Sequence, residues 1–224
     1  MMARRSMLGM IGGSVLLAGC GLSSKRASYR VRVTVDAVTY GRQYSGSSVW
    51  QINAVRNVRI TSEEHAGGAG LIGEAVVLDL PSGPVLVLMR PVDASSTLLP
   101  VRITKALDPE VVPTDAGSFV SSVSKLGGWF GEAKAELPRV DWPLMVRFDN
   151  IDDPRSVEKV DPEAIDIKRI LLETTSDDVT TGIEKKLRWL SNGGLTLDAE
   201  GRPTTNPTFA QTIRQKAFSS EIDK

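Results

Sequence analysis

The chain has 224 residues, with 27 Lys plus Arg against 27 Asp plus Glu, so its formal net charge is zero. The length fits one domain, and a hydrophobic fraction of 41% is ordinary for a protein with a packed core. Balanced charge argues against nucleic acid as a partner, because phosphate binding needs surplus Lys and Arg. One Cys and one His exclude a disulfide framework and a Cys/His zinc cluster, and we expect no metal and no cofactor.

The N-terminus has the pattern of an export signal. Arg4 and Arg5 supply positive charge, and residues 7–18 form an apolar stretch shorter than the roughly 20 residues of a transmembrane helix. The stretch ends in Leu17-Ala18-Gly19-Cys20, which resembles the lipobox of bacterial lipoproteins. That resemblance implies removal of residues 1–19 and a diacylglycerol on the thiol of Cys20, in a lipoprotein that carries fatty acids such as palmitate.

A lipid anchor implies a location in the cell envelope, facing the periplasm, with the membrane as the first partner. Gly21 follows the cysteine, whereas Asp there would resemble an inner-membrane retention signal, so the outer membrane is favoured. The segment Arg4–Leu8 also resembles a twin-arginine export signal, although Ala3 stands where Ser or Thr is expected, and both export routes stay open. Residues 20–28 are small and polar, and predict a lipidated tether.

Residues 29–197 predict one α+β domain built on a mostly antiparallel sheet. Between Tyr29 and Val38, apolar and polar residues alternate as in a half-buried strand. The motif Pro81-Ser82-Gly83-Pro84 predicts a hairpin turn between two strands covered on both faces, whereas residues 63–70 predict a loop. The expected strands are 29–38, 48–60 (as one or two strands), 75–80, 85–89, 144–148 and 164–174.

Helices are expected in two places. Within an insertion at about 91–140, apolar residues recur at helical spacing and predict one amphipathic helix at about 115–136. A capping box at Thr181–Glu184 predicts a short C-terminal helix over 183–190. Residues 198–224 predict a polar, partly disordered tail with a weak helical stretch at 209–218.

The amphipathic helix carries the most suggestive apolar surface. Its stripe either packs on the core or faces another envelope protein, and these two interpretations stay open. The candidate partner-binding residues are Phe119, Val123, Leu126, Trp129 and Phe130.

No arrangement of residues points to catalysis. His65, beside Glu63 and Glu64, lacks a nucleophile on a constrained turn. Residues 68–73 spell G-x-G-x-x-G, but the following residues predict a strand, so no helix N-terminus would face a phosphate. Acidic residues at 149, 152 and 153 suit turns better than a calcium loop, because Pro154 stands where such a loop needs a flexible residue. We therefore expect a non-enzymatic binding or structural role, with an envelope hydrolase that uses carboxylates as the alternative.

A longer pattern lies between Leu144 and Leu190. It reads Val146-Arg147-Phe148, Asp153-Pro154-Arg155-Ser156-Val157 and Val160-Asp161-Pro162, followed by Val179-Thr180-Thr181-Gly182-Ile183 and Leu187-Arg188-Trp189-Leu190. This pattern resembles an uncharacterised family of exported alphaproteobacterial proteins. The resemblance implies export and a shared domain, and it implies no activity.

Overall fold

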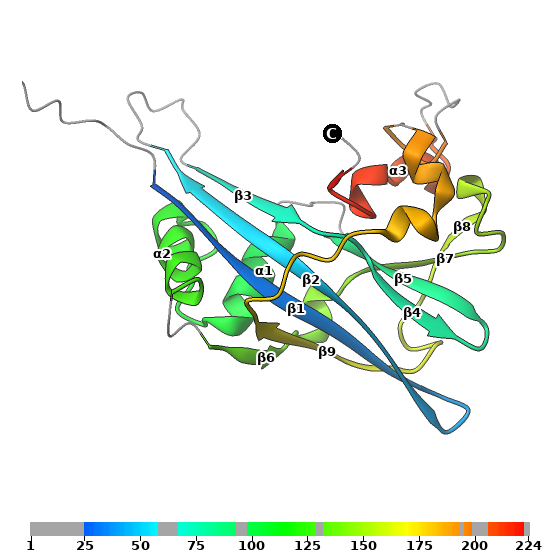
Figure 1. Ribbon diagram of the computed structural model, residues 1–224, viewed down its shortest axis with the longest axis horizontal. Helices are drawn as coiled ribbons and strands as arrows, with labels where there is room; N and C mark the ends of the chain where they lie inside the picture. Colours follow the sequence, from blue (N-terminus) through cyan, green and yellow to red (C-terminus); the bar gives the residue numbers. More distant parts are fainter. Residues whose placement is uncertain are drawn as a thin grey trace, which may run out of the picture.

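The computed structural model describes residues 25–57, 67–92, 98–128, 132–192, 195–198 and 206–221. They form two antiparallel β-sheets and three α-helices, which confirms the predicted α+β class (Figure 1). The predicted signal peptide, Cys20, His65, Trp129 and Phe130 lie outside these residues.

The first sheet has the strand order β3-β2-β1-β9-β6, with every neighbouring pair antiparallel. Tyr40 and Gly41 join its two longest strands through a tight turn with positive φ values of 52° and 70°. The strands are β1 (Lys25–Thr39), β2 (Arg42–Arg56), β3 (Gly67–Ile72), β6 (Lys134–Glu136) and β9 (Ile167–Thr174).

The alternation in β1 divides the faces of this sheet as predicted. Tyr29, Val31 and Val33 are buried on the inner face, whereas Arg30 and Arg32 lie on the outer face and are partly exposed. Helices cover one part of the inner face and the second sheet covers the rest, so a single apolar core joins all three layers.

The second sheet has the order β4-β5-β7-β8. β5 is buried on both faces, as the apolar run of its residues predicts, whereas β4 is an edge strand with Asp79 exposed. The predicted two-sided cover is therefore wrong for β4. These strands are β4 (Val76–Leu80), β5 (Gly83–Pro91), β7 (Pro143–Phe148) and β8 (Val157–Lys159).

The insertion holds two helices, α1 (Leu98–Leu107) and α2 (Ala116–Leu126), not one helix over 115–136. α2 ends at Gly127, where an added Cβ would lie 2.2 Å from the backbone oxygen of Ser28. The chain thus passes too close to β1 for any side chain at this position, and β6 follows. The predicted helix was too long because Gly127 ends α2 through a tertiary contact with β1.

The C-terminal segments from Ile183 onward cover the outer face of the second sheet, with Ile213 and Phe218 fully buried. Residues 206–221 therefore belong to the fold and not to a disordered tail. The predicted helix over 183–190 is wrong, because Gly182 is left-handed (φ 110°) and breaks the expected capping geometry. The elements here are η3 (Ile183–Lys185), η4 (Arg188–Asn192), α3 (Phe209–Thr212) and η5 (Gln215–Ala217).

Two polar segments expected to be irregular are strands. Residues 25–28 of the predicted tether begin β1, and residues 67–70 of the predicted loop begin β3. Pairing with β2 overrides the turn preference of the glycines, since Gly67 fits closely against the backbone of Val55. Within the described residues, no helix has the length and apolar character needed to cross a membrane.

Candidate functional site

The acidic residues at 149, 152 and 153 lie in a segment of bends and turns. Asp149 and Asp152 are exposed, and Asp153 accepts a 3.0 Å hydrogen bond from the backbone N–H of Arg155 at the start of η2 (Pro154–Ser156). The backbone and side-chain hydrogen bonds from Arg155 lower the pKa of Asp153. Among the described residues, no three His, Cys, Asp or Glu side chains are grouped to hold a metal ion. The hydrogen bond that Asp153 accepts at the start of η2 confirms the turn interpretation for this residue.

The predicted partner-binding stripe is a core feature where the structure describes it. Phe119, Val123 and Leu126 are at most 7% exposed and pack in the core under the first sheet. A partner would reach them only if the core opened. Their burial agrees with the core-packing interpretation of the helical periodicity, and the partner role of the stripe stays a prediction.

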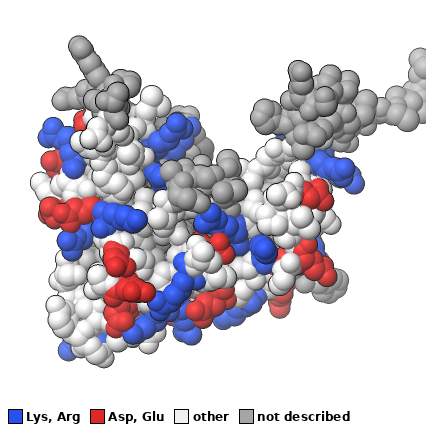
Figure 2. Space-filling view, turned by 180° about the vertical axis from the view of Figure 1, so that it is seen from behind, with Lys and Arg blue, Asp and Glu red and all other residues white. Residues whose placement is uncertain are grey.

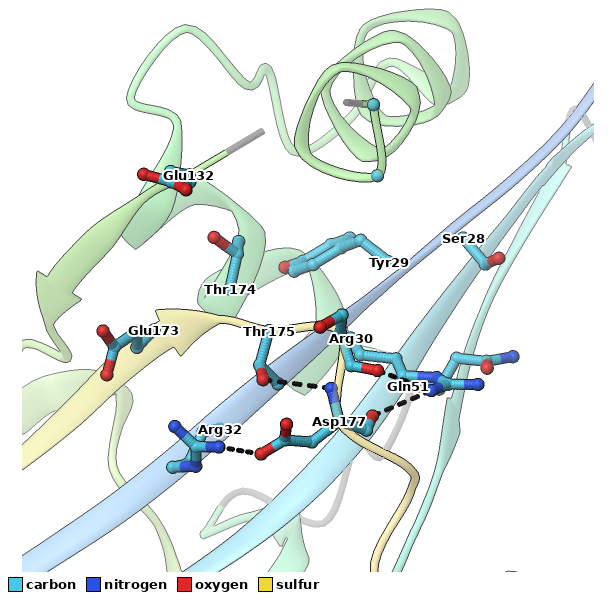
Figure 3. A pocket seen from close by; sticks show the side chains of 13 residues that line it. Ser28, Tyr29, Arg30, Arg32, Gln51, Glu132, Glu173, Thr174, Thr175 and Asp177 are labelled. Carbon is cyan, nitrogen blue, oxygen red and sulfur yellow. Dashed lines mark hydrogen bonds and ion pairs between the residues drawn. The ribbon is translucent and has the colours of Figure 1, made fainter. Parts of the chain in front are cut away.

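A hollow lies beside β1, where the chain leaves β9 (Figure 3). It has a volume of about 810 Å³ and a polar lining. Arg30 and Arg32 of β1, Gln51 of β2, Glu173 of β9 and Glu132 line it. Both signs of charge meet here, and the same interspersion of charges marks the rear face of the molecule (Figure 2).

The arginines of this hollow hold the segment 175–182, which we call the strap, across the outer face of the first sheet. Arg30 Nη1 donates to the carbonyl oxygens of Ser176 and Asp177 at 3.1 and 2.8 Å, and Arg32 pairs with the carboxylate of Asp177. The strap then reaches β2, where Thr180 exchanges hydrogen bonds with Val49. Asp177 and Asp178 of the strap form ion pairs with Arg32 and Arg30, respectively.

A second hollow differs in having only basic charge. This basic groove has a volume of about 540 Å³ and lies between the N-terminal end of β1 and α2. Lys25, Arg26 and Arg56 line it together with small side chains of α2 that include Ser121 and Ser124. The antiparallel register places Lys25 directly opposite Arg56. All three basic residues are exposed.

Sequence reasoning missed this groove. Lys25 and Arg26 were expected in a tether, and Arg56 near the end of a strand had no visible link to them. Their shared site depends on the full length of the β1–β2 pairing, which brings residues 31 positions apart together. The only available signal was that basic side chains begin one strand and end the next.

The comparisons with known proteins add no function. No protein-family model, no characterised protein and no solved structure matches the chain. The resemblance over residues 144–190 therefore stays a prediction.

Proposed function

We propose that this chain is a lipid-anchored cell-envelope protein that faces the periplasm and acts by binding rather than by catalysis. The observation that carries the proposal is the place where the fold begins. β1 starts at Lys25, five residues after the lipobox cysteine Cys20. Five extended residues span at most about 18 Å, so an anchor on Cys20 holds this end of the domain at the bilayer.

The direction of β1 then sets the orientation. The strand has 15 residues and ends at the turn of Tyr40 and Gly41, so it extends about 45 Å at the usual rise per residue. Figure 1 shows this hairpin projecting away from the end where β1 begins. Tyr40 is 85% exposed at the tip. A domain held at Lys25 would present this tip to the periplasm.

The polar groups favour binding over hydrolysis. Hydrolysis by carboxylates needs two acidic side chains that converge in one cleft. Asp153 caps a turn, Asp177 holds the strap through Arg32, and Glu173, which lines the same hollow as Asp177 and Glu132, pairs with Lys134. Asp149 and Asp152 lie exposed on a polar turn. His65, part of the hydrolase alternative, lies outside the described residues.

The test is the intact mass of the protein made in a bacterium with a lipoprotein pathway. We expect a polypeptide that starts at Cys20 and carries a diacylglycerol, and we expect Cys20→Ala to lose the lipid and leave the membrane fraction. A mature chain that starts elsewhere without lipid would overturn the proposal. Gly21→Asp is the matched variant, and we expect it to stay lipidated but move from the outer to the inner membrane.

A further inference from the structure

The β1–β2 pairing creates a like-charge contact that the fold does not need. Lys25 and Arg56 are direct cross-strand partners. Like charges in this position destabilise a sheet, whereas an acidic residue at either place would stabilise it. An unfavourable charge pair that no interaction inside the fold compensates is typical of a binding site.

Nothing within the described part of the chain neutralises the three cations of the basic groove. Lys25, Arg26 and Arg56 form no side-chain hydrogen bond or ion pair there, in contrast to Arg30 and Arg32, five and seven residues along the same strand from Lys25. Asp115, at the start of α2, accepts a 2.8 Å hydrogen bond from the backbone N–H of Gly117 and caps the helix. The groove therefore keeps a surplus of positive charge.

The groove also has the form of a headgroup site. Its volume of about 540 Å³ is in the range of small-ligand pockets. Ser121 and Ser124 are exposed on the α2 side and add hydroxyl donors to the basic side chains. Phosphate oxygens accept hydrogen bonds from Lys, Arg and hydroxyl groups, and this groove offers all three kinds of donor.

We propose that the basic groove binds the phosphate of an anionic phospholipid in the same bilayer that holds the Cys20 anchor. This inference rests on the proposed function, because the anchor brings Lys25 within about 18 Å of the headgroups. The short connection selects the lipid over a free anion, since it keeps the groove beside a negatively charged surface. The anchor and groove together fix the tilt of the domain on the membrane.

The test uses the mature lipoprotein in nanodiscs, with an environment-sensitive dye on Ser121→Cys. Cys20 is the only cysteine of the chain, and its thiol is blocked by the lipid, so the dye reports on the groove alone. We expect phosphatidylglycerol discs to shift the emission to the blue and to protect the dye from iodide, relative to phosphatidylcholine discs. Raising the salt from about 0.1 M to about 1 M shortens the Debye length from about 10 Å to about 3 Å and should reverse the shift.

Two triple variants decide the cause. Lys25→Gln, Arg26→Gln and Arg56→Gln together should abolish the lipid-dependent shift, while Arg42→Gln, Lys105→Gln and Lys159→Gln make the same change in net charge elsewhere and should preserve it. Equal emission in both kinds of disc, or a groove variant that still shifts, would overturn the proposal. A shift produced by millimolar inorganic phosphate without lipid would also overturn it, in favour of a free-anion site.

The absence of a lipid on Cys20 can be distinguished from a failure of the groove to bind lipid. If the dye labels Cys20 in the wild-type chain, the proposed function has failed and the groove is tested on the unanchored protein by sedimentation with phosphatidylglycerol vesicles. The groove variant should then bind about 100-fold more weakly than wild type, because each basic side chain near an anionic surface contributes about a fivefold gain. Equal binding would contradict the groove independently of the anchor.

Discussion

The indole N–H of Trp50 donates a 2.7 Å hydrogen bond to the backbone carbonyl of Glu74, where the two sheets meet. The hydroxyl of Ser48 donates to the same carbonyl at 2.9 Å. The carboxylate of Glu74 accepts a 2.7 Å hydrogen bond from the N–H of Ile183, which begins η3. Glu74 thus joins the first sheet to the segments that cover the second.

Trp50→Phe tests this junction. The substitution removes the indole donor at a fully buried position and leaves a cavity beside a half-satisfied carbonyl. We expect the free energy of unfolding to fall by about 2 kcal/mol, measured by urea denaturation. Ser48→Ala should cost less, about 1 kcal/mol, because the indole bond remains. A smaller effect for Trp50→Phe than for Ser48→Ala would contradict this account.

Glu74 makes stability depend on pH. Burial raises the pKa of its carboxyl, the repulsion of Glu184 and Glu221 acts in the same direction, and the Ile183 hydrogen bond and Lys185 oppose the rise. Because the pKa of Glu74 is higher in the folded than in the unfolded protein, the unfolded chain loses this proton at lower pH. The free energy of unfolding therefore falls as pH rises from the ordinary pKa through the pKa in the folded state. The loss is complete above the folded pKa.

Glu74→Gln should remove this contribution while its amide oxygen still accepts the Ile183 hydrogen bond. We therefore expect the variant to gain stability relative to wild type between mildly acidic and neutral pH. Parallel urea titrations at several pH values measure the difference. A difference that is constant with pH would show that the carboxyl titrates alike in both states.

Gly46→Ala tests how closely the sheets approach. An added Cβ at Gly46 would lie 2.3 Å from the carbonyl oxygen of Val77 in β4, so the sheets must move apart. We expect a loss of about 2–3 kcal/mol in unfolding free energy. Gly68→Ala in β3 is the matched control, since nothing lies within 4 Å of its added Cβ, and it should change stability by less than about 0.5 kcal/mol. Equal effects of the two substitutions would exclude a steric cause.

The strap should respond locally to Arg30→Gln. Arg30 holds two backbone carbonyls and Asp178, but its side chain is 35% exposed and water can replace these contacts. We expect a global loss below about 1 kcal/mol and a larger increase in hydrogen exchange at residues 175–182. The control is Lys168→Gln, which removes a different exposed ion pair, between Lys168 and Asp166. It should leave hydrogen exchange in the strap unchanged.

Local sequence patterns could be predicted, whereas contacts that depend on long-range strand register could not. Alternation in β1 and the turn at Gly83 were sufficient for the antiparallel sheets, because each depends on neighbours along the chain. The C-terminal cover was missed because Ile213 and Phe218 are isolated apolar residues in a polar stretch, and only contact with the second sheet buries them. The basic groove was missed for a related reason, since the Lys25–Arg56 contact depends on long-range strand register.

The central claim is that the start of β1 lies at the bilayer and the Tyr40 turn projects from it. Energy transfer from a dye on Tyr40→Cys, in the lipoprotein reconstituted in nanodiscs, to an acceptor on the lipid headgroups measures the height of the tip, with Ser121→Cys as the reference. The account predicts that the tip stands tens of ångströms above the reference, since β1 extends about 45 Å. Equal heights for the two dyes would contradict it.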